Sequence, residues 1–314
     1  MSAPGAGGAG AGAGAGVPGA AAAATAADAH AEALALEGLL ISRAYLCTLF
    51  HKLLGAAPDA EVLDALLGRA TADVVDEYAE DDESMRGLGC FLAGLAARED
   101  RAGLLDAARD EYTRLFVGPG ALPAPTWESP YLSREMALFQ EGTLEVRAVY
   151  RAHGLQPKRV QRVPDDHVAL LCAYLAQRAS VALAAFHTGD WAALSVELRD
   201  ELSFVEGHMT TWLAAFAKSL RVSSTAVLYP QAVEALAAFA AVDATFLAEA
   251  AYWAEGQAGG EGGSLAALPA DSPEAAAFEA ALEALASLEA ARPFGIEDYE
   301  LEALRPCADA RQGR

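Results

Sequence analysis

Cationic residues are scarce in this chain of 314 residues. It carries 22 Lys and Arg against 44 Asp and Glu, which gives a formal net charge of -22. A field of that sign repels nucleic acids and anionic membrane surfaces and favours basic partners. We therefore expect no nucleic-acid partner, although acidic residues on solvated helix surfaces would produce the same total.

Cysteines are also few, and no two of them form a CxxC pair. The four cysteines lie far apart, at Cys47, Cys90, Cys172 and Cys307. This spacing argues against a disulfide framework or a zinc ribbon and fits a reducing compartment. Cys47 and His51 stand four residues apart and could form half of a metal site, but no second pair completes it, so we predict no metal.

Long apolar runs and signal sequences are missing as well. No stretch of about 18 apolar residues free of charge occurs outside the Gly/Ala-rich start, which has too little Leu, Ile or Phe to insert into a membrane. The first cationic residue is Arg43, so the start lacks the positively charged region of a secretory or twin-arginine signal. We expect a cytoplasmic protein that does not insert into membranes.

What is abundant is Ala, Leu and Glu with apolar residues at helical spacing, which predicts an all-α fold of about ten helices in one globular domain. Residues 1–27 are Gly/Ala low complexity and predict a disordered tail. Residues 28–254 should form the helical domain. Residues 255–314 should be a linker followed by a C-terminal helix and tail, an appendage outside the core.

Three segments stand out from the helical pattern: EYTRLFVGPG at 111–120, PAPTWESPYLSRE at 123–135 and VPDDH at 163–167. The four prolines between residues 117 and 130 are incompatible with a continuous helix and predict a semi-rigid loop around Trp127. Pro164 and the two acidic residues after it have the order of a helix start.

The order and spacing of these segments resemble the TorD/DmsD/NarJ-like family of cytoplasmic molybdoenzyme chaperones. Its members share a Glu-x3-Phe-x-Gly-Pro run, an aromatic Pro-rich loop and a Pro-Asp-His-type helix start. Here Phe116, Gly118 and Pro119 match the first motif, but Glu111 stands five residues before Phe116 rather than four. The resemblance covers about residues 34–254.

The resemblance implies a function without catalysis. Such a chaperone binds the twin-arginine leader and the apo-form of a molybdopterin-dependent oxidoreductase and holds it until cofactor insertion and export. The fold would be all-α, and the protein a monomer or a helix-exchanged dimer. A NarJ-type assembly factor, which docks on the catalytic subunit of a membrane-bound reductase, is the alternative.

The resemblance makes Trp127, Tyr131, Asp166 and His167 the residues that contact the peptide, and Glu128 and Asp165 join them on chemical grounds. A leader offers two guanidinium groups and an apolar stretch, so its receptor needs carboxylates beside an aromatic trough. The residues expected to shape the loop are Phe116, Gly118, Pro119, Pro123, Pro125 and Pro164. Each also has a structural explanation, as a helix start or as a loop anchor.

A basic cluster precedes the Asp-Asp-His turn and comprises Arg147, Arg151, Lys158, Arg159 and Arg162. It is either a solvated loop or a weak contact for a nucleotide or for the pyrophosphate of molybdopterin. An enzyme that uses His167 as general base beside this cluster is a third alternative. No GxSxG, HExxH or Walker-type motif supports it, so we predict no enzymatic activity.

Overall fold

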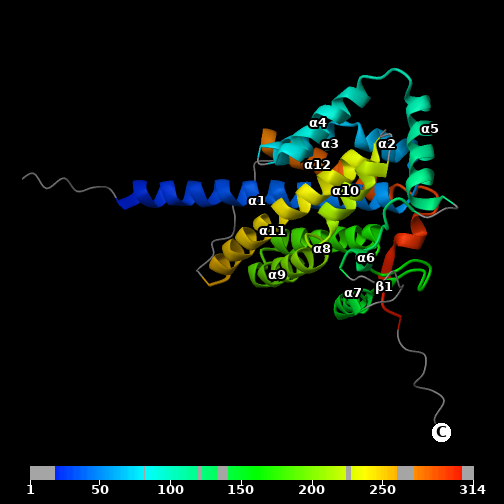
Figure 1. The fold of residues 1–314 in the computed structure, drawn as a ribbon. Coiled ribbons are helices and arrows are strands. Elements are labelled where there is room, and N and C mark those ends of the chain that lie inside the picture. Colours follow the sequence, from blue (N-terminus) through cyan, green and yellow to red (C-terminus); the bar gives the residue numbers. More distant parts are fainter. Residues whose placement is uncertain are drawn as a thin grey trace, which may run out of the picture.

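The computed structural model describes residues 18–80, 82–118, 122–132, 141–223, 228–259 and 272–305. Within these ranges the chain forms twelve α-helices, one π-helical turn, one 3₁₀ turn and one small two-stranded sheet, so the prediction of an all-α fold is confirmed (Figure 1). The elements are α1 (Pro18–Gly55), α2 (Ala60–Leu66), α3 (Arg69–Ala79), α4 (Glu83–Ala96), α5 (Arg101–Tyr112), η1 (Thr113–Val117), α6 (Ser129–Leu132), α7 (Glu141–Ala152), β1 (Leu155–Pro157), α8 (Val168–Thr188), α9 (Trp191–His208), α10 (Leu213–Ser223), α11 (Tyr229–Gly259), α12 (Pro273–Ala290), η2 (Ile296–Tyr299) and β2 (Leu301–Ala303).

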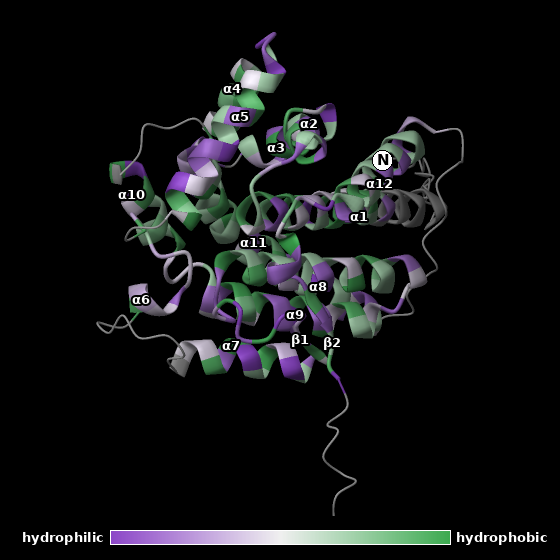
Figure 2. Ribbon diagram, turned by 90° about the vertical axis from the view of Figure 1, so that its right-hand side faces the viewer, coloured by the Kyte–Doolittle hydropathy of each residue, from purple (hydrophilic) through white to green (hydrophobic). Residues whose placement is uncertain are grey.

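The long helix α1 runs through the middle of the molecule (Figure 1). It packs chiefly against α8 and also against α12, while α9 packs against both α8 and α11. Figure 2 shows α7 and the small sheet on one side of this central layer and α2 to α5 on the other. The buried side chains of these helices join in one hydrophobic core.

Polar caps fix where several helices begin. The carboxylates of Asp59, Asp100 and Asp190 accept hydrogen bonds of 2.9, 2.8 and 3.0 Å from backbone N–H groups in the first turns of α2, α5 and α9. Ser272 does the same for α12. Gly189 ends α8 with a φ of 68°, a left-handed conformation that costs glycine little. These boundaries agree with the cap residues visible in the sequence.

A buried ionic cluster lies in the core between α1, α9 and α11. The Arg43 guanidinium donates to Asp243 Oδ1 at 2.7 Å and to Glu201 Oε2, and all three side chains are fully buried. Burial raises the pKa of Glu201 to about 7. Burial likewise raises the pKa of Asp243. One guanidinium thus faces two carboxylates, and both retain a proton more readily than they would in water.

The first helix begins earlier than the sequence indicated. It starts at Pro18 and not near Asp28, so residues 18–27 belong to α1 and the expected tail boundary at residue 27 is wrong for them. Ala has the highest helix propensity, and the Ala-rich run extends a helix whose later turns are anchored in the core. Residues 1–17 lie outside the described residues.

The expected C-terminal appendage is instead part of the folded unit. Helix α11 continues to Gly259, beyond the expected boundary at residue 254, and residues 260–271 lie outside the described part of the chain. After them, α12 packs on α1 and buries Leu285, Leu288 and Ala291 in the common core. The strand β2 then pairs antiparallel with β1. The apolar stripe of α12 therefore packs on an apolar face of α1. The periodicity of the sequence alone does not reveal this packing.

Three helices have the length and composition that would allow them to cross a membrane: residues 30–55 of α1, α8 and α11. The most apolar window of each is 72%, 56% and 44% buried within the protein. These segments therefore contribute to the core of the helical unit.

Candidate functional site

The Pro-rich loop and the beginning of α8 lie side by side. Trp127 and His167 form an isolated antiparallel bridge. Backbone hydrogen bonds flank it, from Glu128 N to Asp166 O at 3.1 Å and from Val168 N to Thr126 O at 2.8 Å. The structure thus brings together two of the three segments that stood out in the sequence.

The Asp166 carboxylate anchors the loop through hydrogen bonds. Its carboxylate is fully buried and accepts hydrogen bonds from Ser129 N at 2.9 Å, from Ser129 Oγ and from Thr143 Oγ1 at 3.1 Å. These partners belong to α6 and α7. One carboxylate therefore connects α6, α7 and the start of α8, and its oxygens are taken up by groups of this chain.

Asp165 forms an ion pair at the edge of the same site. Its Oδ2 accepts from Arg147 Nε at 2.5 Å, and its backbone carbonyl accepts from the Tyr150 hydroxyl at 3.0 Å. The Asp165 side chain is 1% exposed and that of Arg147 is 23% exposed. Among the described residues, Asp165 Oδ1 has no hydrogen-bond partner. The pair therefore presents one guanidinium to the surface and one unused carboxylate oxygen beneath it.

His167 is the N-cap of α8. Its Nδ1 accepts a hydrogen bond from Ala169 N at 3.1 Å, and burial lowers the pKa of its imidazole to about 3. The ring of Tyr299 packs on it at 4.6 Å. The carboxylates of Asp165 and Asp166 are bonded to other groups. The Asp–His pair that the enzyme interpretation required is therefore not formed among the described residues.

The remaining predicted contact residues surround an aromatic wall. Tyr131 lies against Trp212 at 5.3 Å, and its hydroxyl donates to Pro125 O at 2.8 Å, which closes the loop. The buried Glu128 carboxylate pairs with His208 Nδ1 at 3.0 Å, and burial raises the pKa of Glu128.

Trp127 is the exception in this wall, because its polar atom lacks a partner. The side chain is half-buried, and its Nε1 is enclosed without an acceptor among the described residues. An indole N–H is a donor only, so this atom is a candidate to bind a carbonyl of a ligand.

The first motif bends where its spacing is irregular. The extra residue between Glu111 and Phe116 coincides with the π-helical turn η1, whose hydrogen bonds span one residue more than those of an α-helix. The ring of Phe116 packs edge-on against Tyr229 at 5.1 Å, and Glu111 accepts from Tyr229 N at 3.2 Å. Gly118 follows η1 in an extended conformation, whereas Pro119 lies outside the described residues.

Most of the basic cluster is paired with carboxylates. Beyond the Arg147 pair, Lys158 bonds to Glu300 at 2.7 Å, and Arg159 and Arg162 bond to Asp298 at 3.0 and 3.2 Å. Arg151 is exposed. These partners come from the C-terminal segment, whose relation to the loop could not be read from the sequence. A phosphate contact at this cluster stays a prediction.

Sequence reasoning missed the partners of the predicted residues. Four side chains complete the site: His208, Ser129, Thr143 and Tyr299. None of them was predicted to be functional. Only Ser129 carried a signal, as the residue before Pro130. Long-range partners of this kind carry no local pattern.

Comparisons of the sequence find one matching family model and several similar chaperones. A family model described as nitrate reductase delta subunit matches residues 75–218. The Tat proofreading chaperone DmsD of Salmonella paratyphi A is 39% identical over 89 residues, which are 26% of this chain and 44% of the relative. The probable Tat proofreading chaperone DmsD of Haemophilus influenzae is 32% identical over 107 residues, 33% of this chain and 53% of the relative. The chaperone protein TorD of Vibrio cholerae (strain M66-2) is 28% identical over 195 residues, 62% of this chain and 85% of the relative.

The chain thus spans about half the length of these DmsD relatives, and most of the length of the TorD relative. The relatives are named as chaperones, in agreement with the prediction that the chain is not an enzyme. The matched family region contains the loop, the Asp-Asp-His turn and α8. The comparisons therefore confirm the resemblance of this chain to the TorD/DmsD/NarJ-like family.

Proposed function

We propose that this protein is a system-specific cytoplasmic chaperone that binds the twin-arginine leader and the apo-form of a molybdopterin-dependent oxidoreductase. It would hold that client until cofactor insertion and export. The observation that carries the proposal is the meeting of the Trp127 loop with the Asp-Asp-His turn inside the region that the family model matches. Whether it works as a monomer or as a helix-exchanged dimer stays a prediction.

The leader arginine needs a carboxylate that it can reach. Asp166 is an unsuitable partner, because it is fully buried and already accepts three hydrogen bonds from groups of this chain. Asp165 is better placed, since Arg147 already binds it from the surface side and one of its oxygens is unused among the described residues. We propose that Arg147 occupies Asp165 in the free protein and that a guanidinium of the leader displaces it. One arginine–carboxylate pair is then exchanged for another.

The apolar part of the leader would follow the neighbouring wall. Leu132 and Leu144 are 53% exposed at the ends of α6 and α7 next to Asp166's partners, and Val117 is 60% exposed after η1. These exposed aliphatic side chains, together with the half-buried Trp127, would supply the apolar contacts that such a stretch requires. Asp166 and His167 would then position the loop rather than touch the leader.

The test is a titration of the protein with a synthetic leader peptide. Asp165→Asn should weaken binding about ten-fold or more, because one charge-assisted bond is lost. Glu145→Gln on the exposed side of α7 is the matched control and should bind like the parent. A leader in which lysines replace both arginines should also bind weakly. Equal affinity of the parent for both leaders would remove the proposed binding mode.

A second candidate is an assembly factor of the NarJ type, and the description of the matching family model favours it. Such a factor would recognise the catalytic subunit of a membrane-bound reductase without a cleaved leader. Binding of a mature apo-subunit from which the leader has been deleted would select this candidate. Dependence on the paired arginines would select the first.

A further inference from the structure

The C-terminal residues lie across the basic edge of the molecule. We call residues 155–162, which comprise β1 and the cationic loop after it, the basic edge, and residues 296–303 the acidic strap. Two kinds of contact join them. Strand β2 pairs with β1 in antiparallel register, with Gln156 opposite Glu302. Carboxylates of the strap also pair with Lys158, Arg159 and Arg162.

The strap also covers His167 at the start of α8. Tyr299 packs on the imidazole of His167, which is 6% exposed. Ile296 is buried against Gly55, where a Cβ atom would lie 2.5 Å from its Cδ1, so a larger residue at position 55 would require the Ile296 side chain to shift. Removal of the strap would therefore uncover His167 together with the three cations.

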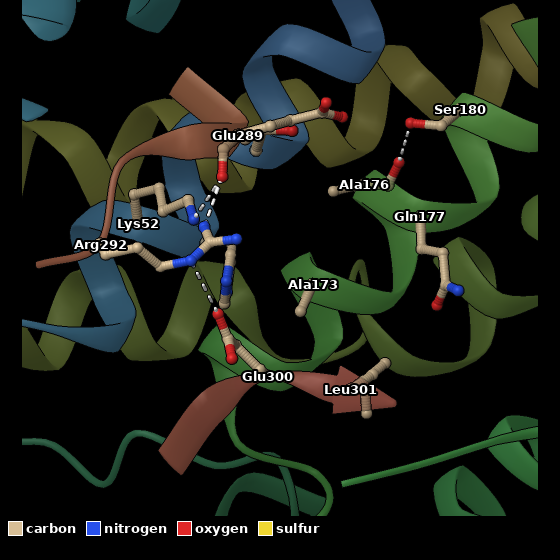
Figure 3. A pocket seen from close by; sticks show the side chains of 11 residues that line it. Lys52, Ala173, Ala176, Gln177, Ser180, Glu289, Arg292, Glu300 and Leu301 are labelled. Atoms are coloured by element: carbon tan, nitrogen blue, oxygen red, sulfur yellow. Dashed lines mark hydrogen bonds and ion pairs between the residues drawn. The ribbon is translucent and has the colours of Figure 1, made fainter. Parts of the chain in front are cut away.

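The remaining polar contacts of the strap lie at its outer edges. The cations of the basic edge are 47 to 67% exposed, so their ion pairs are individually weak and are screened by salt. On the other side the strap borders a cavity of about 400 Å³, in which Lys52 and Arg292 both point towards the end of α12 (Figure 3). The segment is thus held by Ile296, by Tyr299 and Leu301, which pack against the core, and by a three-residue strand.

We propose that the basic edge is a docking site for an extended acidic peptide, which the acidic strap occupies until a segment of the client replaces it. The strap itself shows the required chemistry: carboxylates at Glu297, Asp298 and Glu300 around an aromatic residue, followed by a strand that adds to β1. The claim that the replacing segment comes from a client rests on the proposed function. The claim that the basic edge binds an acidic peptide does not depend on that function.

Exchange of the strap is measured with a labelled peptide of the sequence RPFGIEDYELEALR, which copies residues 292–305. In the parent this peptide competes with a tethered copy whose effective concentration is of millimolar order. Glu297→Lys with Asp298→Lys should release the tethered copy and increase peptide affinity about ten-fold or more in fluorescence anisotropy. The control, Glu279→Lys with Glu283→Lys, changes the net charge equally on exposed positions of α12 and should bind like the parent.

A reversible lock provides the second measurement in the full chain. Gln156 and Glu302 face each other in the pairing of β1 with β2, and such pairs lie at a Cα separation of about 5.5 Å, within the range of a disulfide. Oxidised Gln156→Cys/Glu302→Cys should bind no labelled peptide, and reductant should restore the binding of the parent. The parent treated with the same oxidant controls for its own cysteines.

The outcomes separate the two proposals. Equal peptide affinity in the released, control and oxidised proteins, or no peptide binding by the released variant, would overturn the docking site. Leader binding by the parent tests the proposed function alone. Where the leader binds, the oxidised lock should reduce the affinity for the apo-client at least about ten-fold, and an unchanged affinity would overturn the replacement by a client segment.

Discussion

Asp166 separates the structural role of the site from its binding role, so its substitution is the most informative perturbation. In Asp166→Ala, the Ser129 N–H loses its acceptor in a fully buried place. The hydroxyls of Ser129 and Thr143 lie 3.1 Å apart and satisfy one another only in part. About two donors are then unpaired, at about 1–3 kcal/mol each, so the free energy of unfolding should fall by about 2–6 kcal/mol.

Asp166→Asn is the conservative comparison. Its amide oxygen can accept from both groups of Ser129, and its amide N–H can donate to the Thr143 hydroxyl. Only the charge assistance is lost, so the free energy of unfolding should fall by about 1 kcal/mol. Urea unfolding followed by circular dichroism measures both variants. A loss in the Ala variant no greater than that in the Asn variant would refute the assigned network.

The same pair of variants reports on the leader. Because Asp166 is enclosed by Ser129 and Thr143, we expect Asp166→Asn to bind the leader within about two-fold of the parent, which is less than one hydrogen bond to a charged group contributes. In Asp166→Ala the loop loses its attachment and leader binding should fall together with stability. A stable Asn variant that no longer bound the leader would make Asp166 a contact residue and contradict the assignment of Asp165.

Four further predictions concern buried ionisable side chains. Arg43→Met leaves two buried carboxylates without a cation and should lower the free energy of unfolding by about 3–5 kcal/mol in urea titrations, whereas a loss below about 1 kcal/mol would contradict the pairing. The folded-state pKa of Glu201, about 7, lies above its unfolded value, so the contribution of Glu201 to stability falls as the pH rises towards 7. In Glu201→Gln this decline of Tm with rising pH should be absent. The folded-state pKa of His167, about 3, lies below its unfolded value, so the contribution of His167 to stability falls as the pH drops below about 6.5. His167→Asn should therefore make the decline of Tm at acidic pH less steep. An unchanged decline would contradict the role of His167 as a neutral helix cap. Glu111→Ala should cost about 1 kcal/mol, because Glu111 caps the start of α11, while Glu111→Gln should retain most of the stability in thermal melts.

The sequence predicted the fold class and most helix boundaries, because these depend on local signals. Caps such as Asp100 and Asp190 and the stop at Gly189 are encoded within a few residues of the helix ends that they fix. The helical spacing of apolar residues located the helices, but it did not show that α12 would pack on α1. For that reason the predicted boundary was wrong at the C-terminal end of the domain, whereas at the N-terminal end the Ala-rich run extended α1 back to Pro18.

The candidate site was predicted in part. The family resemblance implied that Trp127 and the Asp-Asp-His turn share one site, and the structure places the two segments together. Burial of Asp166 by Ser129 and Thr143 was not predicted, since hydrogen-bond partners far apart in the sequence leave no spacing signature. The pairing of the basic cluster with the C-terminal segment was missed for the same reason.

The central claim is that this protein binds the precursor of a molybdoenzyme. The most direct measurement is a pull-down of the tagged protein from its native cytoplasm under conditions that induce molybdoenzymes, with bound chains identified by mass spectrometry. The account predicts recovery of a precursor that carries a paired-arginine leader, and a weaker yield with Asp165→Asn. Recovery of no such precursor by the folded parent protein would contradict it.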